Sequence, residues 1–326
     1  MATVALIIFA VLLLAFVSIF IIDFVKRRKS ESKYHRSEVI MALALLIPAV
    51  ALAFYFVVLP IVFSLGYAFT DAYILDIQNT HFVGFKNFAD LFNEFAEHGE
   101  IYYAVSNTAL FVVLVVPIQI ILALLLALFC NNKRRGTVIF KICFFAPVAV
   151  SLSVTSFLWI VLLKGDSSGI INSILGIFGI PARDFLREKN TAIIWMVIIS
   201  AWQGCGYQML IFLSALGNIR KDLYEAASID GAGPFRRFFT VTLPGLRPTL
   251  LYILITVFIG ACRVLIQPML LTGNTDEGRT ISFYIYNMAM GQGYGFVGLS
   301  CAAALLMTLV IGSITFAMRR FLREKK

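Results

Sequence analysis

Charged residues are scarce in this sequence. Asp, Glu, Lys and Arg together make up 14% of its 326 residues, whereas an average soluble domain contains about 25% charged residues. Hydrophobic residues make up 60%. This balance excludes an intrinsically disordered chain, and it argues strongly against an ordinary soluble globule. The composition instead favours a chain that spans a membrane.

The residue types of common catalytic and metal sites are also few. There are three His and five Cys, with no Cys-x-x-Cys pair and no His close to any Cys. The apolar stretches carry no cluster of His, Cys and carboxylates at metal-ligand spacing and no nucleophile beside a base. The phosphate-binding pattern G-x-x-x-x-G-K-[ST] is absent as well. We therefore expect no catalytic residue, metal or cofactor on this chain.

What the sequence does contain is seven long apolar runs. Their approximate limits are 3–25, 39–69, 104–130, 138–163, 191–216, 248–271 and 296–318. About 20 apolar residues suffice for a helix to cross the hydrocarbon core. The first run lacks a preceding basic segment and is followed by four basic residues at 26–29, which favours a retained helix over a cleaved signal. The sequence thus predicts an all-α polytopic membrane protein with seven spans.

The distribution of basic residues predicts the orientation of these spans. The net charge of +9 would also suit a nucleic-acid-binding protein. However, nineteen of the 27 Lys and Arg residues lie in four alternate segments, at 26–38, 131–137, 217–247 and 319–326. The three intervening loops hold only six. Because cytoplasmic loops are enriched in Lys and Arg, we expect the N-terminus outside, the C-terminus in the cytoplasm, and no nucleic-acid partner.

The longest predicted cytoplasmic segment is 217–247. Its sequence predicts a short helix at 222–229 with Asp222 as its cap, and a turn at 230–234. A second helix follows, with Phe235, Phe238 and Phe239 on an apolar face, and Leu243-Pro244 is expected to end it. Such an elbow between two spans can transmit force from a bound protein, or it can lie on lipid as an interfacial amphipathic helix. The residue pattern alone leaves both readings open.

Residues at fixed spacing in this segment resemble the EAA loop of ABC importer permeases, usually written EAA, then G, then I-x-LP. The counterparts here are Glu225-Ala226-Ala227, Asp230-Gly231-Ala232, Val241 and Leu243-Pro244. Val241 replaces the usual Ile, and Arg220 stands where many relatives have Pro. Segment 82–88 similarly resembles the FVG-x-x-N-[FY] stretch of carbohydrate-type permeases such as MalF and UgpA. The resemblance covers about residues 39–321.

This resemblance implies a six-helix type I importer core at 39–326, preceded by an extra transmembrane helix and basic linker at 1–38. The chain would be a permease in the bacterial inner membrane that carries a sugar, oligosaccharide or polyol phosphate inward by alternating access. ATP and Mg would bind to a separate dimer of cytoplasmic ATPases, and the other partners would be a second, different permease and an extracytoplasmic solute-binding protein. The residues implied in ATPase coupling are Glu225, Ala226, Ala227, Asp230, Gly231, Ala232, Phe235, Phe238, Leu243 and Pro244.

Polar residues inside the predicted spans are candidates for the solute path, because such residues usually face a cavity or the bundle interior. Gln203 and Tyr207 lie four residues apart in one span, and Arg263 and Gln267 lie four apart in another. Amides, aromatic rings and a guanidinium suit a sugar, and a guanidinium also suits a phosphate. Structural roles remain open: interhelical bonding for the amides, and carbonyl bonding, partner pairing or snorkelling for Arg263.

Three other functions remain as alternatives. An importer permease for an amino acid or ion is disfavoured by segment 82–88. An ATP-independent channel or secondary transporter needs no ATPase dock, so the loop at 225–244 argues against it. A membrane enzyme is disfavoured by the missing catalytic clusters. Gly204 and Gly206 are expected to be close-packing positions in their helix.

Overall fold

The computed structural model describes residues 46–322, except for 132–135, 189–190, 274 and 292–294. The predicted span at 3–25 and the basic linker lie outside the described residues. The secondary-structure elements of the described residues are helices, where η marks a 3-10 or π-helical segment. They are η1 (Phe54–Val58), α3 (Leu59–Tyr67), η2 (Ile77–Asn79), α4 (Lys86–Ala96), α5 (Glu100–Cys130), α6 (Thr137–Phe145), η3 (Ala146–Ala149), α7 (Leu152–Leu162), α8 (Ile170–Ile177), α9 (Thr191–Asn218), α10 (Lys221–Ile229), α11 (Pro234–Arg237), η4 (Phe238–Thr242), α12 (Leu243–Cys262), α13 (Ile266–Leu271), α14 (Ile281–Met290) and α15 (Val297–Leu322).

Long apolar helices confirm the prediction of an all-helical, multi-span protein. Five in the described part of the chain are long and apolar enough to cross a bilayer: Leu46–Tyr67, Glu100–Cys130, Thr191–Asn218, Pro234–Leu271 and Val297–Arg320. A sixth crossing is available if Thr137–Ala149 and Leu152–Leu162 are counted together. A seventh would require the run at 3–25, which is not described.

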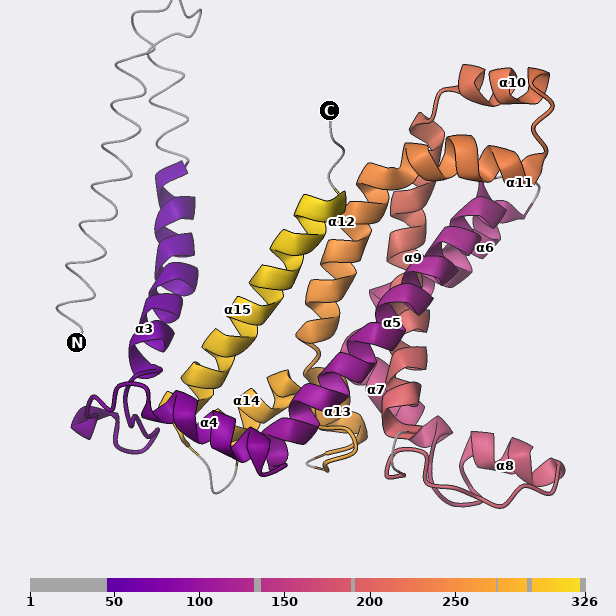
Figure 1. Ribbon diagram of the computed structural model, residues 1–326. Helices are drawn as coiled ribbons and strands as arrows, with labels where there is room; N and C mark the ends of the chain where they lie inside the picture. Colours follow the sequence, from indigo (N-terminus) through magenta and orange to yellow (C-terminus); the bar gives the residue numbers. More distant parts are fainter. Residues whose placement is uncertain (1–45, 132–135, 189–190, 274, 292–294, 323–326) are drawn as a thin grey trace, which may run out of the picture.

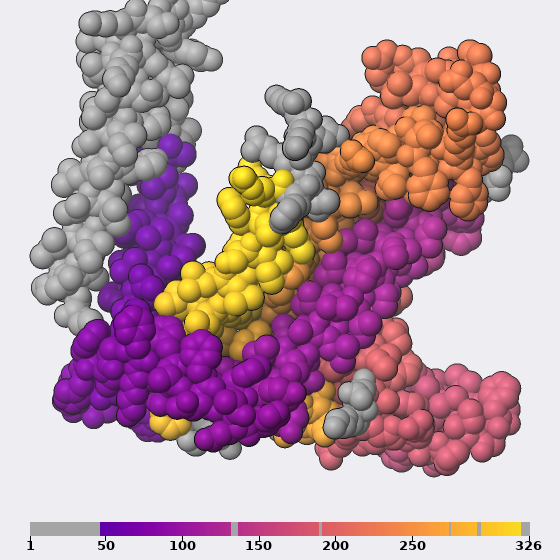
Figure 2. Space-filling view, viewed as in Figure 1, coloured from indigo at the N-terminus to yellow at the C-terminus, as the bar shows by residue number. Residues whose placement is uncertain are grey.

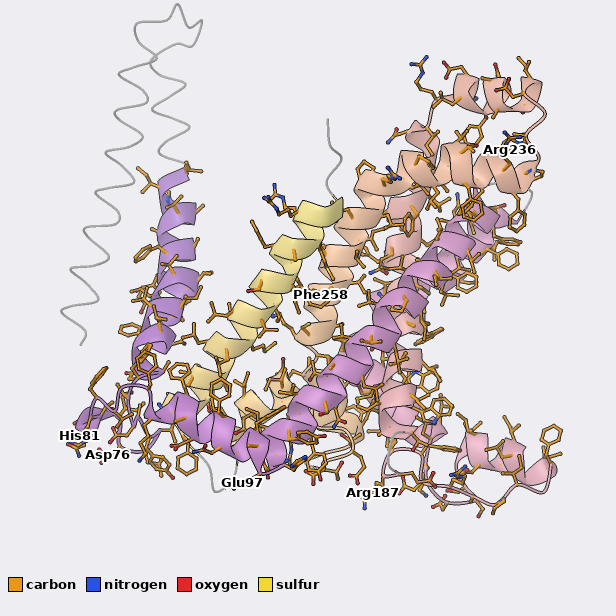
Figure 3. All side chains as sticks on the ribbon, in the orientation of Figure 1. Asp76, His81, Glu97, Arg187, Arg236 and Phe258 are labelled. Carbon is orange, nitrogen blue, oxygen red and sulfur yellow. The ribbon has the colours of Figure 1, made fainter. Side chains whose placement is uncertain are left out.

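The loops gather at the two ends of the bundle in the alternation that the charge pattern predicts (Figure 1). The α10–α11 elbow and the C-terminal end of α15 lie toward one end, and α4, α8 and α14 lie toward the other. Figure 3 shows Arg236 at the first end, and Asp76, Glu97 and Arg187 at the second. The described parts of the segments predicted to share a membrane face therefore lie at the same end of the molecule.

The core of the bundle is formed mainly by α5 and α9, with α12 packed against both. Small residues allow the close approach. A β-carbon at Gly206 would overlap the backbone oxygen of Phe144, and one at Gly204 would overlap the Gln119 side chain, so both glycines are close-packing positions. By contrast, only 6% of the most apolar window of Leu46–Tyr67 is buried, and this helix contacts α15 near one end and diverges from the bundle toward the other (Figures 1 and 2).

Two prolines follow wide π-helical turns, and this corrects the predicted helix end at Leu243-Pro244. The helix runs from α11 through η4 into α12 without a stop. In η4 the Leu243 N–H bonds to the carbonyl of Phe238, and in η1 the Leu59 N–H bonds to Phe54 in the same way. Proline lacks an N–H and its ring crowds the preceding turn, and a wider turn just before it accommodates both effects. Pro60 and Pro244 each sit two residues beyond such a turn.

Two predicted spans are broken, which also differs from the sequence-based prediction. The run at 138–163 bends by 99° between Ala149 and Leu152. The 3-10 turn η3 contains Pro147, and the Ser151 hydroxyl then accepts a hydrogen bond from Val154 N at 3.3 Å, which starts α7 as a new helix. In the run at 248–271, α12 ends at Cys262 and the short α13 begins only at Ile266.

Candidate functional site

A glutamine side chain satisfies the backbone at the first helix break. Gln203 lies in α9 and is 8% exposed. Its Nε2 donates to the carbonyl of Val150 at 3.0 Å and to the Thr155 hydroxyl at 3.2 Å, with a longer bond of 3.5 Å to Pro147. Non-helical backbone is tolerated at membrane depth only where protein or a water-filled cavity satisfies its polar groups. Gln203 therefore has a clear structural role at the bend.

Hydroxyl groups satisfy the second break in the same manner. Thr280 Oγ1 donates to the Val264 carbonyl at 2.8 Å, and Ser282 Oγ donates to the Cys262 carbonyl at 3.3 Å. Gln267 in α13 is 2% exposed, and its Oε1 accepts a hydrogen bond from Ser200 Oγ of α9 at 2.6 Å. Because α13 also packs against α7, the two helix breaks lie close together. Side chains of α9 form hydrogen bonds at both of them.

A cavity of about 440 Å³ lies between these elements. Three of the four predicted solute-path residues line it together, namely Gln203, Arg263 and Gln267. Tyr207 does not: it is half exposed and lines a separate hollow beside Phe145. Gln203 and Tyr207, which lie four residues apart in α9, therefore line different cavities.

Other polar residues of this cavity were not among the predicted sites. They are Gln119 from α5, Ser200 and Gln208 from α9, and Thr256 from α12. Gln119 carried a usable signal, because it is a polar residue within a strongly apolar run. The absence of a side chain at Gly204 makes room for the Gln119 amide.

The cavity has one charged lining residue and several uncharged polar ones. Of the described residues that line it, Arg263 alone is charged. Its side chain is exposed, and no carboxylate of the described chain forms a salt bridge with it. The Oε1 atoms of Gln203 and Gln208 are buried and have no hydrogen-bond partner among the described residues. The cavity therefore presents one cation, and two unpaired amide oxygens are buried beside it.

A polar network at the start of α5 fixes the loop between α13 and α14. Buried Arg279 pairs with Glu100 at 3.2 Å and Asp276 at 3.0 Å. Asn107 Nδ2 donates to the carbonyls of Asp276 and Arg279 at 2.6 and 3.0 Å. This network anchors the segment that supplies Thr280 to the second helix break.

A tyrosine–glutamate bond ties the same region to α4. Tyr284 donates its phenolic hydrogen to Glu94 Oε2 at 2.8 Å. Burial first, and then this carboxylate, raise the pKa of Tyr284 well above its usual value. The phenol is therefore a stable hydrogen-bond donor at neutral pH.

The second candidate site is the elbow that contains the EAA-like residues (Figure 3). The predicted short helix is present as α10, but Asp222 does not cap it. Arg220 occupies the cap position, and Asp222 lies in the first turn, where its Oδ1 accepts a 3.1 Å bond from Arg220 Nε. The helix therefore begins one residue earlier than predicted. The Asp222 carboxylate pairs with Arg220 and does not act as the N-cap.

Gly231 forms the turn of the elbow. Its φ of +72° lies in the left-handed region that glycine adopts without steric cost. Ala232 N then bonds to the carbonyl of Ala227 at 2.9 Å, which closes α10 with a Schellman-type cap. Two side-chain bonds hold the arms together, from Tyr224 Oη to Thr242 Oγ1 at 3.0 Å and from Arg237 Nη1 to Ser228 Oγ at 3.1 Å.

The elbow presents apolar groups and a carboxylate to its surroundings. No residue of α10 is buried. Exposed apolar side chains are Leu223, Ile229, Phe235 and Phe239, and Phe235 is 82% exposed. Glu225 is also exposed, whereas Phe238 and Pro244 are half-buried. An exposed cluster of this kind is typical of a protein-binding surface.

A multi-span helical bundle with an exposed elbow, and with a cavity lined partly by polar side chains, is typical of a membrane transport subunit, and comparison with known proteins agrees. Residues 95–326 match the family described as binding-protein-dependent transport system inner membrane component. The chain belongs to this family: it is a multi-pass inner-membrane permease subunit of an ABC importer.

Several characterised relatives are similar over most of their length. The lactose permease LacF of Rhizobium radiobacter is 31% identical, over 86% of this chain and 93% of its own. The glycerol-3-phosphate permease UgpA of Yersinia pestis is 33% identical, over 76% and 82%. A solved bacterial transporter for the import of alginate superposes with a TM-score of 0.76 at 22% identity, covering 88% of this chain and 96% of that one, which supports the fold.

Proposed function

We propose that this permease carries a sugar, an oligosaccharide or a polyol phosphate through the cavity between the two broken spans. The observation that supports this most directly is the convergence of Gln203, Gln208, Arg263 and Gln267 on one cavity between the broken spans. Amide and guanidinium groups are well suited to hydroxyl and phosphate oxygens. The printed names of the relatives, which include lactose and glycerol-3-phosphate permeases, favour the same solute class.

The elbow is proposed as the dock for a separate ATPase. Glu225 would face a basic group on that subunit, and Phe235 would insert into an apolar groove beside it. The exposure of both residues and the rigid Gly231 turn support this role. ATP and Mg would stay on a dimer of such ATPases, and the complex would also hold a second, different permease and an external solute-binding protein. The elbow and the C-terminus would then face the cytoplasm.

The docking role is tested by Glu225→Ala in the assembled transporter. We expect the variant to reach the membrane at normal levels, to retain less ATPase on co-purification, and to lose uptake. Glu97→Ala is the matched control, because Glu97 is an exposed acid at the opposite end of the bundle (Figure 3). Normal ATPase retention together with normal uptake in Glu225→Ala would rule out the dock.

A further inference from the structure

The cavity at the helix breaks has an electrostatic character that narrows the solute class further. Arg263 follows the last residue of α12, and it is the only charged group among the described lining residues. A guanidinium stays protonated in any protein environment. The C-terminal end of α12 offers it only a partial negative charge. Because Arg263 is exposed and forms no salt bridge with a carboxylate of the described residues, its positive charge is available to an anionic group in the cavity.

The two orphan amide oxygens indicate a second requirement. Gln203 and Gln208 are 8% and 9% exposed, and their Oε1 atoms have no hydrogen-bond partner in the described part of the chain. The orientation of the Gln203 amide is fixed, because its Nε2 already donates to the carbonyl of Val150, which has no hydrogen to give. A donor such as water or a solute hydroxyl satisfies an acceptor of this kind, and it reaches these two buried oxygens when the neighbouring side chains move aside.

From these observations we infer that the transported solute is a polyhydroxylated anion, such as a sugar acid or a polyol phosphate, and not a neutral sugar. This inference rests on the solute role proposed for the cavity. Arg263 would bind the carboxylate or phosphate, and planar guanidinium groups favour both. Gln203 and Gln208 would accept hydrogen bonds from solute hydroxyls. A volume of about 440 Å³ lies within the range of small-molecule sites.

Binding to the purified importer complex in lipid nanodiscs tests this directly, without the solute-binding protein and its own selectivity. The probes are two matched pairs, glycerol with glycerol 3-phosphate, and glucose with glucuronate. We expect each anion to bind at least about tenfold more tightly than its neutral counterpart, the scale of one charged hydrogen-bonding interaction. Equal binding within both pairs, or no binding of either anion, would overturn the inference.

Substitutions then assign the preference to individual residues. Arg263→Gln should weaken anion binding about 10- to 100-fold and weaken binding of the neutral probes much less, and Arg263→Lys should restore part of the loss of anion binding. Gln208→Leu should weaken both members of a pair. Arg187→Gln, which removes an exposed arginine in an outer loop, is the matched control and should change nothing. Unchanged anion binding in Arg263→Gln would also refute the inference.

The outcomes separate this inference from the proposed function. If glucose is taken up and binds as well as glucuronate, the carbohydrate permease role stands and the anion preference alone is wrong. If no member of either pair binds or is transported, both are wrong.

Discussion

The left-handed turn at Gly231 allows a sharp test of whether the shape of the elbow matters. The informative change is Gly231→Ala, since it adds one carbon at a φ of +72° and a β-carbon there meets no atom within 4 Å. Crowding therefore does not contribute, and the effect comes from the backbone alone. Gly233→Ala is the matched control two residues away, because Gly233 has an extended conformation (φ −67°) and equally open surroundings.

The backbone cost gives the expected magnitude. A non-glycine residue in the left-handed region costs roughly 1–2 kcal/mol. If the Ala232-to-Ala227 cap must form for docking, the affinity for the ATPase should fall by about 5- to 30-fold. Asn tolerates this conformation better than Ala, so Gly231→Asn should lose less. The expected order of affinity is wild type and Gly233→Ala, then Gly231→Asn, then Gly231→Ala.

The assay is ATPase retention on the detergent-solubilised permease, titrated with added ATPase, together with uptake in membrane vesicles. All variants should reach the membrane equally, since the turn lies outside the core clusters. The reasoning would be refuted if Gly231→Ala bound ATPase as tightly as Gly233→Ala. It would also be refuted if Asn and Ala at position 231 were equivalent, because steric bulk or sequence identity would then be the cause.

Two further changes test the packing that supports the cavity. Gly206→Ala should lower the yield of folded, monodisperse permease, because its β-carbon would overlap the Phe144 carbonyl. Gly217→Ala is the control, because Gly217 lies on the same helix in open space and its substitution should not lower the yield. Equal yields of the two variants would contradict the close contact at Gly206. Gln203→Leu should destabilise the protein by about 1–3 kcal/mol by leaving the Val150 carbonyl unsatisfied. Thermal unfolding of the two proteins measures it, and an unchanged midpoint would show that the bond contributes no net stability.

The sequence predicted the spans well, because a long apolar run is by itself enough to define a membrane helix. Pro147 indicated a kink, but the sequence did not predict a bend of 99° there or the gap after Cys262. The bend after Pro147 and the gap after Cys262 are stable because Gln203, Thr280 and Ser282 reach them from other segments. Such capping by distant side chains is tertiary information and leaves no local pattern in the broken run.

Local rules also gave the wrong result where neighbouring structure overrode them. Pro244 is a normal helix breaker by sequence, yet the wide turn before it keeps the helix intact. Helical spacing placed Gln203 and Tyr207 on one face, but Gln203 bonds across the bend while Tyr207 lies beside Phe145, in a different hollow. The elbow was predicted more fully, since its turn depends on Gly231 and on few distant contacts.

The uninterrupted helix from the elbow into the membrane has a mechanical consequence. Figure 1 shows α11 lying across the end of the bundle and α12 running from it toward the opposite end. The 20 residues of α12 span about 30 Å. If α12 turns as a rigid arm, a tilt of about 10° at its Leu243 end swings its Cys262 end by about 5 Å. That displacement is comparable to one helical turn, enough to carry the Arg263 guanidinium from one set of neighbours to the next.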